Sequence, residues 1–419
     1  MFNTDWLAAT RLTNAGRLTE ATAALQRMLA GNRTTPSATT ATAWSTPPTI
    51  DGVAESAYAQ PAPQAEPPAT RGSGVGWLPF NPAASVKPTT PRALRGFLDQ
   101  VSQGGFLPPG SADLGSSPAA PRVPMPEGAQ FLAATFSDEA GSRPYKVYVP
   151  STYRPEQPAP LVVMLHGCTQ SPDDFAAGTR MNEMAELHTC LVVYPGQTTS
   201  ANMQRCWNWF SEADQHRDRG EPALIAGITR QIMRDYAVDP GRVYLAGLSA
   251  GGAAAAIMGE AYPDLYAAIG VHSGLACGAA SDMPSAFAAM RGGSMNGSGN
   301  AARSEAPRRR IVPVIVFHGD RDTTVNPRNG DAVVAQSTQA ARLETRAEKG
   351  QVPGGYAYTR VLNIQADGRT VVEHWTVHGA GHAWFGGSSA GSYTDPRGPD
   401  ASREMLRFFL QHPHPAPIA

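Results

Sequence analysis

The sequence is poor in charge and in cysteine, and it has no long run of apolar residues. Charged residues make up 16% of the 419 residues, and the 34 basic and 35 acidic side chains leave a formal net charge of −1. This balance gives no strong overall field, so it does not indicate a nucleic-acid partner or an anionic membrane surface. No run of roughly 18 apolar residues occurs, and we therefore expect no membrane-spanning helix.

The few cysteines are not arranged as metal ligands. Cys168, Cys190, Cys206 and Cys277 show no C-x-x-C spacing, which is typical of cysteine metal sites. His166 has no histidine, cysteine or carboxylate at ligand spacing, so we do not expect it to bind a metal. The sequence therefore predicts no metal site, and it permits a disulfide without requiring one.

The beginning of the chain lacks the pattern of a secretory signal peptide. Asp5, Arg11, Arg17, Glu20 and Arg27 interrupt every apolar stretch, so the apolar region that such a signal needs is missing. The residues themselves therefore leave the localisation of the protein open. They also give no indication of its oligomeric state.

Three regions follow one another along the chain. Residues 1–31 place apolar residues at helical spacing on both sides of a break at residues 14–16, which predicts a small helical hairpin. Residues 32–126 are rich in Pro, Ala, Ser and Thr, and such a composition buries too little apolar surface to order itself. We predict a largely disordered linker there, followed by a compact domain at residues 127–412.

The region 127–412 alternates strand-like and helix-like segments. Continuous apolar runs such as 161–165 and 314–317 are typical of buried parallel strands, and residues 221–236 place isoleucines along one helical face. This alternation predicts an α/β fold with a mostly parallel central sheet and helices on both faces. Residues 278–310 are rich in Gly, Ala and Ser, and we predict a flexible insertion near the mouth of the site.

A G-x-S-x-G motif supplies the candidate nucleophile. The motif occupies residues 247–251, between an apolar strand at 243–246 and a helix of small residues from 252 to 257. In this context the motif forms a sharp turn that exposes the serine at the top of an α/β-hydrolase sheet. The helix N-terminus favours negative charge beside Ser249. The alternative is a simple glycine turn, but the flanking strand and helix favour the nucleophile.

A serine nucleophile needs a base, and in α/β-hydrolases the partners follow in the order Ser, Asp, His. Asp320 and Asp322 both follow the buried strand that ends at residue 317. Asp322 lies further into the loop, where it can turn back toward a histidine, whereas Asp320 is interpreted as a turn residue that binds backbone N–H groups. His382 lies beyond two glycines at a loop tip, and His378 continues a strand. We predict Asp322 and His382 as the partners of the serine.

An oxyanion hole needs two backbone N–H donors aimed at the developing charge. The amide of Ala250, directly after the nucleophile, is the first candidate. The second is expected in the turn at residues 165–170, which follows an early strand. Gly167 lets the backbone approach closely there, which makes the amide of Cys168 the predicted second donor.

Three segments together resemble the polyhydroxybutyrate (PHB) depolymerase family of esterases, which is related to feruloyl and acetylxylan esterases. The segments are Leu-His-Gly-Cys-Thr-Gln at 165–170, Cys-Trp-Asn-Trp-Phe at 206–210 and Gly-Leu-Ser-Ala-Gly-Gly at 247–252. The resemblance covers about residues 130–410 and implies an α/β-hydrolase fold, a Ser-Asp-His triad and no cofactor. Members are typically extracellular, whereas this sequence shows no signal peptide.

The resemblance and the triad together predict a serine esterase. The first substrate hypothesis is short-chain polyhydroxyalkanoate or its oligomers, because Trp207, Trp209 and Trp384 would form an apolar groove for a polyester. Core packing is the alternative for Trp207 and Trp209. The second hypothesis is a feruloyl or acetylxylan ester of a carbohydrate, which the same triad would hydrolyse. A third, a catalytically inactive binding module of the same fold, predicts no labelling of Ser249 by a fluorophosphonate.

A disulfide between Cys168 and Cys206 is predicted for protein that meets an oxidising compartment. Cys168 lies in the oxyanion turn, and Cys206 opens a segment that must lie near the same sheet edge to line the pocket. Cys190 and Cys277 flank apolar strands and are interpreted as small buried or loop thiols. The alternative is that all four cysteines are free thiols.

Overall fold

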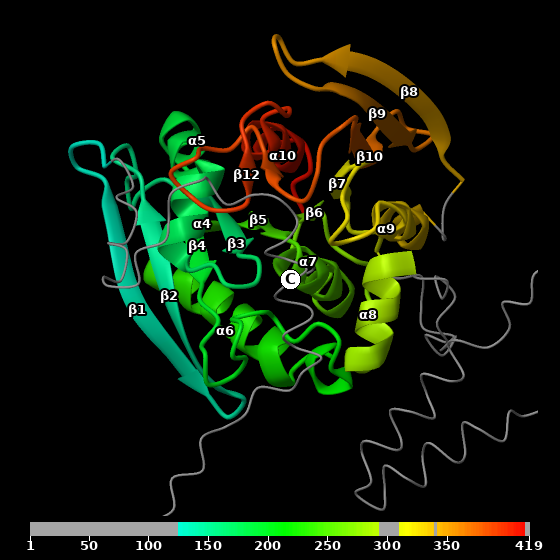
Figure 1. The fold of residues 1–419 in the computed structure, drawn as a ribbon. Helices are drawn as coiled ribbons and strands as arrows, with labels where there is room; N and C mark the ends of the chain where they lie inside the picture. Colours follow the sequence, from blue (N-terminus) through cyan, green and yellow to red (C-terminus); the bar gives the residue numbers. More distant parts are fainter. Residues whose placement is uncertain (1–124, 293–309, 339–341, 415–419) are drawn as a thin grey trace, which may run out of the picture. The chain divides into compact units, whose positions relative to one another are not determined.

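The computed structural model describes residues 125–292, 310–338 and 342–414 (Figure 1). These residues belong to one unit, Val86–Ala419. The predicted helical hairpin at residues 1–31 lies outside the described residues, as does the predicted linker at residues 32–126 apart from its last two positions.

A ten-stranded sheet forms the centre of the described part of the chain. Its strands are β1 Gln130–Asp138, β2 Gly141–Val149, β3 Ala159–Leu165, β4 Leu191–Pro195, β5 Val238–Leu248, β6 Ala268–His272, β7 Val314–Gly319, β8 Glu344–Gln351, β9 Ala357–Ile364 and β10 Thr370–Val377. The strand order is β1-β2-β4-β3-β5-β6-β7-β10-β9-β8. The six central strands, from β4 to β10, run parallel, and two antiparallel strands join at each edge.

Helices cover both faces of this sheet (Figure 1). They are α4 Pro172–Thr179, α5 Met181–His188, α6 Gly220–Asp235, α7 Ala250–Ala261, α8 Met283–Gly292, α9 Arg328–Thr338 and α10 Ala401–Leu410. Ile225 of α6 and Val333 of α9 belong to one apolar cluster, and Ala185 of α5 and Phe408 of α10 belong to another on the opposite face. The predicted mostly parallel sheet with helices on both faces is confirmed.

The apolar runs in the sequence become the buried strands of the centre. All seven residues of β3 are buried, because β4 and β5 flank it and helices cover both of its faces. Residues 278–310 differ from the prediction, since α8 forms within them. Small residues masked the apolar face of this helix in the sequence, and residues 293–309 lie outside the described part.

The parallel strands bring distant loops to one edge of the sheet. β5, β7 and β10 end at Leu248, Gly319 and Val377, and parallel strands present their carboxyl ends at the same edge. The loops after these three strands carry the predicted nucleophile, carboxylate and base. A separate two-stranded sheet, β11 Trp384–Phe385 and β12 Thr394–Asp395, follows the loop after β10.

Over residues 125–292, 310–338 and 342–414, no helix combines the length and the hydropathy that crossing a bilayer requires.

Candidate active site

Ser249 occupies a strained turn between β5 and α7. Its φ of 57° and ψ of −117° lie in a region that residues with side chains rarely adopt. A Cβ atom on Gly247 would collide with the carbonyl oxygen of Gly251, and one on Gly251 would collide with that of Leu165. Only glycine fits at these two positions, which explains the motif physically. The amide of Ser249 donates to the carbonyl of His272 at 2.9 Å and holds the turn on β6.

His382 is oriented by a buried carboxylate. Its Nδ1 atom lies 2.7 Å from Oδ2 of Asp322, which is 5% exposed. The other oxygen of Asp322 accepts from the amides of Thr324 and Val325, each at 2.9 Å. Burial by itself raises the pKa of Asp322, but the charges and hydrogen bonds of His382 and His318 outweigh it and hold this pKa well below its usual range. The carboxylate is therefore ionised and fixes His382 with Nδ1 as the donor.

His318 is a second histidine beside the same carboxylate, and the sequence analysis did not single it out. It is buried, with Nε2 at 2.9 Å from the carbonyl oxygen of Val325 and 3.4 Å from Oδ2 of Asp322. Both neighbours are acceptors, so Nε2 carries the proton and the ring supports the charge of Asp322. The available signal was its place at the end of β7, directly before the loop that carries Asp322.

Asp320 and His378 form a separate pair on the surface. Nδ1 of His378 lies 3.0 Å from Oδ2 of Asp320, and the other oxygen of Asp320 accepts from the amide of Gly379 at 2.7 Å. The side chains of His378 and Asp320 are 43% and 36% exposed. Neither residue lines the cavity that Ser249 and His382 share. The structure thus brings Asp322, and not Asp320, to His382.

The turn after β3 presents the amide of Cys168 without a partner among the described residues. The amide of Gly167 donates to Oε1 of Gln170 at 2.9 Å, and that of Thr169 donates to the carbonyl of Gln204 at 2.6 Å. Only the amide between them remains available. At the other candidate position, Ala250 is the first residue of α7, where backbone amides have no partner within the helix.

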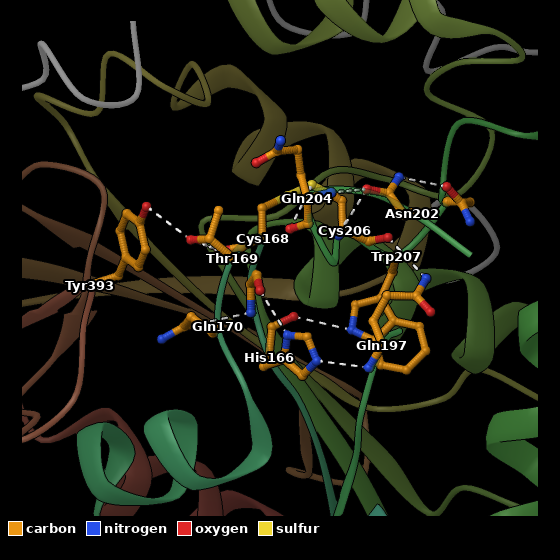
Figure 2. Close-up of a disulfide and its surroundings, with 12 residues drawn as sticks. His166, Cys168, Thr169, Gln170, Gln197, Asn202, Gln204, Cys206, Trp207 and Tyr393 are labelled. Carbon is orange, nitrogen blue, oxygen red and sulfur yellow. Dashed lines mark hydrogen bonds between the residues drawn. A yellow bond between two sulfur atoms is a disulfide. The ribbon is translucent and has the colours of Figure 1, made fainter. Parts of the chain in front are cut away.

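His166 supports this turn from below (Figure 2). Its Nδ1 atom lies 2.7 Å from the carbonyl oxygen of Gly167, and its Nε2 accepts from the amide of Gln197 at 3.0 Å. Burial lowers the pKa of His166 to about 4, so the ring is neutral and Nδ1 is the donor. His166 is therefore a structural residue of the oxyanion turn.

A disulfide joins Cys168 to Cys206, with the two Cα atoms 4.2 Å apart (Figure 2). Buried Glu221, the first acidic residue of α6, holds the segment after Cys206: it accepts from the amide of Asn208 at 2.7 Å and from its side chain at 2.8 Å. Gln197 also donates to Glu221 and binds the carbonyl oxygen of Cys206 at 3.0 Å. The sequence analysis missed Glu221, because an acidic residue in a first helical turn is usually exposed.

Two of the three tryptophans predicted to contact the substrate are core residues. Trp207 is fully buried and donates from Nε1 to the carbonyl of His166 at 3.1 Å. Trp384 is 1% exposed and donates to Oγ of Ser402 at 3.1 Å. Neither lines the two cavities at Ser249, which corrects the sequence-based assignment. Trp209 does line one of them.

Two cavities meet at Ser249. The first, here called the His382-side cavity, holds about 330 Å³ of empty space, part of it open to solvent. The second, the α8-side cavity, holds about 590 Å³ on the same measure. The His382-side cavity is lined by Gly167, Cys168, Gln170, Leu248, Ser249, Thr324, His382 and Tyr393. Ser249 and Cys168 line both cavities.

Comparisons with known proteins relate this chain to esterases. Residues 143–347 match the family described as "Esterase PHB depolymerase", a span that includes Ser249 and Asp322 and ends before His382. Poly(3-hydroxyalkanoate) depolymerase C of Paucimonas lemoignei is 33% identical over 54% of this chain and 55% of its own length. Feruloyl esterase B of Neurospora crassa is 28% identical over 64% of this chain and 89% of its own length.

A solved structure shares the fold. The acetyl xylan esterase from Aspergillus awamori aligns with a TM-score of 0.51 at 19% identity, over 68% of this chain and 99% of that one. At this identity the likeness shows the fold alone, and the predicted α/β-hydrolase fold is confirmed. The chain spans only 55% of the length of the depolymerase from Paucimonas lemoignei.

Proposed function

We propose that this chain, whose residues 143–347 belong to the esterase PHB depolymerase family, hydrolyses carboxylic esters through an acyl-enzyme on Ser249. One observation carries the proposal: His382, bound to buried Asp322 at 2.7 Å, lines the same cavity as Ser249 on its strained turn. A serine hydroxyl becomes a useful nucleophile only beside such an oriented base. This arrangement supports acyl transfer more directly than a binding role.

In the first half of the reaction, Oγ of Ser249 attacks the ester carbonyl carbon, and its proton passes to Nε2 of His382. Asp322 stabilises the imidazolium that forms and keeps Nδ1 as the donor. The amides of Cys168 and Ala250 donate to the oxyanion of the tetrahedral adduct. The adduct collapses when its bond to the alcohol oxygen breaks, and that oxygen takes the proton from Nε2.

In the second half, water replaces the alcohol. His382 removes a proton from the water as it attacks the acyl carbon, and a second tetrahedral adduct forms in the same oxyanion hole. Its collapse breaks the bond to Oγ of Ser249, which regains its proton from His382. The products are a carboxylic acid and the free enzyme, with no cofactor consumed.

Two ester classes are proposed as substrates. Short-chain polyhydroxyalkanoate or its oligomers come first, because the family and the 33% identical depolymerase both concern such polyesters. A feruloyl or acetylxylan ester of a carbohydrate is the second candidate, favoured by the feruloyl esterase that matches over 89% of its length. Both classes use the same triad and differ in the groups that the two cavities must hold.

A substrate panel tests the proposal. Purified full-length protein is assayed on polyhydroxybutyrate film, soluble hydroxybutyrate oligomers and feruloylated arabinoxylan, and Ser249→Ala serves as the inactive control. We expect release of soluble hydroxybutyrate products. Release of ferulate alone would move the chain to the second class. No hydrolysis of any ester, together with no labelling of Ser249 by a fluorophosphonate, would remove the proposal.

A further inference from the structure

The direction in which an ester lies across Ser249 follows from proton transfer. The leaving alcohol oxygen takes its proton from His382, so it must lie within hydrogen-bond reach of that ring. His382 lines the smaller, His382-side cavity and does not line the α8-side cavity. The alcohol part of the ester therefore occupies the His382-side cavity, and the acyl part extends from Ser249 and Ala250 into the α8-side cavity.

The α8-side cavity is apolar and formed in large part by one helix. Met283, Ala286, Phe287 and Met290 line it from α8, and this spacing places them on one helical face. Leu275, Phe210 and Trp209 continue the apolar lining across from α8. The cavity holds about 590 Å³ of empty space, part of it open to solvent, compared with about 330 Å³ in the His382-side cavity. An acetyl group would leave most of this surface uncovered.

Two amide side chains, those of Asn202 and Gln204, lie in the lining of this apolar space. Gln204 is half-buried and lines the cavity, and its side-chain amide has no hydrogen-bond partner within the described residues (Figure 2). The neighbouring Asn202 is already engaged, since its Nδ2 donates to Asn208 at 2.8 Å and its Oδ1 accepts from the amide of Gln204 at 3.0 Å. Gln204 is thus available to bind a polar atom of the occupant.

The loop that carries Asp322 and the first turn of α9 hold α8 in place. The amide of Asn326 donates to the carbonyl of Met290 at 2.8 Å, and its side chain donates to that of Arg291 at 3.0 Å. Asn329 donates to the carbonyl of Ala289 at 2.9 Å. These bonds pair the carbonyl groups of the last turn of α8, which have no hydrogen-bond donors within the helix itself. The helix is therefore a fixed wall of the cavity.

We propose that the α8-side cavity is the acyl pocket and that it selects acyl groups much larger than acetyl, mainly apolar, with a hydrogen-bonding group within reach of Gln204. The inference rests on the proposed esterase function and deepens it. A hydroxyalkanoyl oligomer, which repeats apolar segments and ester carbonyls, and a phenolic cinnamoyl group both meet this description. An acetyl ester of xylan does not, which removes one of the substrate classes suggested by the relatives.

The test varies the acyl group while the alcohol stays the same. The full chain is assayed on p-nitrophenyl acetate, butanoate and hexanoate, and kcat/KM is compared. Each methylene that leaves water for the pocket contributes about 0.8 kcal/mol, or roughly a fourfold rise in kcat/KM. We expect kcat/KM to increase from acetate to hexanoate.

Filling the pocket should reverse this preference. Ala286→Leu places a larger side chain in the lining and is expected to lower kcat/KM for hexanoate by about tenfold or more relative to acetate. Ala288→Leu is the matched control, because Ala288 lies exposed on the same helix and the same change there adds nothing to the pocket. Met290→Trp fills the pocket from a half-buried position. If Ala286→Leu does not fold, the hexanoate-to-acetate ratio of kcat/KM in Met290→Trp provides the test.

The outcomes separate the two proposals. A hexanoate-to-acetate ratio that falls in Ala286→Leu or Met290→Trp, but not in Ala288→Leu, supports the acyl pocket. An active enzyme that prefers acetate, or whose ratio is unmoved by both filling variants, overturns the inference and leaves the esterase function standing. Absence of hydrolysis of every ester and of fluorophosphonate labelling would instead remove the proposed function itself.

Discussion

The strained backbone of Ser249 and the packing around it together determine where the Oγ atom of this residue lies. A non-glycine residue in this region of φ and ψ costs on the order of 1–3 kcal/mol, and the structure balances this cost with the bond to His272 and with glycines that admit the neighbouring backbone. The strain lifts Oγ out of the sheet edge toward both cavities. The turn thus lowers the stability of the fold locally and exposes the hydroxyl of Ser249.

Ser249→Ala is expected to abolish ester hydrolysis without unfolding the protein. Loss of a triad serine typically lowers turnover by about a millionfold, and the smaller alanine removes no buried contact. Hydrolysis of a soluble ester, with circular dichroism as the control for folding, measures this effect. Activity near wild type in a folded variant would refute the assignment of the nucleophile.

The two aspartates near the end of β7 are expected to behave differently. Asp322→Asn should lower turnover by roughly 10⁴, because His382 loses its orienting carboxylate and adopts the wrong tautomer. Asp320→Asn disturbs an exposed pair with His378 and should change turnover only a few-fold. Both variants are measured side by side on one ester, and the reverse ranking would transfer the carboxylate role to Asp320.

We expect Glu221 to make the stability of the protein depend on pH. Burial raises its pKa to about 7, although hydrogen bonds from Asn208 and Gln197 and the charge of Arg143 lower it. The unfolded chain releases this proton near pH 4.5, the ordinary value for a glutamate. The folded state therefore binds the extra proton, and the free energy of unfolding falls as pH rises from about 4.5 to about 7.

Glu221→Gln tests this prediction, since glutamine has no proton to release in that range. Urea unfolding of the variant and of the wild type is measured at several pH values between 4.5 and 7.5. We expect the fall in unfolding free energy over this interval to be smaller in the variant. Equal slopes in the two proteins would contradict the assignment.

At the scale of elements, the Cys168–Cys206 disulfide ties the oxyanion turn to the segment that Glu221 holds. The bond closes a loop with a sequence separation of 38 residues, for which chain-entropy estimates give about 3–4 kcal/mol of stabilisation. The segment after Cys206 has little regular structure, and hydrogen bonds to Glu221 and Gln197 hold it in place. The turn therefore has both a covalent and a hydrogen-bonded support.

Removal of both cysteines should lower stability and turnover together. In the double variant Cys168→Ser and Cys206→Ser, we expect the unfolding free energy to fall by about 3–4 kcal/mol and turnover to fall by up to about 10², the cost of one misplaced oxyanion donor. Dithiothreitol should lower the Tm of the wild type and leave that of the double variant unchanged. Free thiols at both positions in a non-reduced digest of oxidatively produced protein would end this idea.

The elements differ in how far the sequence specifies them. The run at 161–165 predicts β3 because central parallel strands are apolar on both faces. The sequence did not predict α8, because small residues interrupt the apolar pattern of this helix. No local pattern indicates that one of its faces lines a cavity. Trp384 is adjacent to the loop of His382 in sequence, yet β11 turns its ring onto Phe175 and His272 in the core. Burial of such residues depends on tertiary contacts that no local pattern contains.

At the scale of the whole molecule, the candidate site lies entirely within the described part that follows residue 160. We expect deletion of residues 1–125 to leave hydrolysis of a small soluble ester within a few-fold of the value for the whole chain, because most of these residues have the composition of a linker. Steady-state kinetics of the two proteins provide the measurement. A truncated protein that folds but loses this activity would show that the N-terminal region contributes to the site.

The closeness of the three candidate catalytic residues was predictable, because their chemistry restricts their positions more tightly than packing restricts the core. The nucleophile turn requires glycines at fixed positions, and the order of the three residues follows from the order of the strands. The supporting residues were not predicted. His318 lies only four positions before Asp322, but its contact with that carboxylate depends on how the loop after β7 folds back. Glu221 acts through Gln197 and Asn208, which lie further away in the sequence. Of the three tryptophans predicted to contact the substrate, only Trp209 lines a cavity at Ser249.

The position of β10 in the chain determines how late in folding the three candidate catalytic residues can come together. β10 is the last strand of the ten to leave the ribosome, and it pairs with β7 in parallel before its loop delivers His382. A chain complete only as far as α9 holds Ser249 and Asp322 but lacks His382. Because such long-range pairing forms slowly, recovery of hydrolysis during refolding should lag behind recovery of helix content. The time course of recovered hydrolysis would then report when β10 pairs with β7.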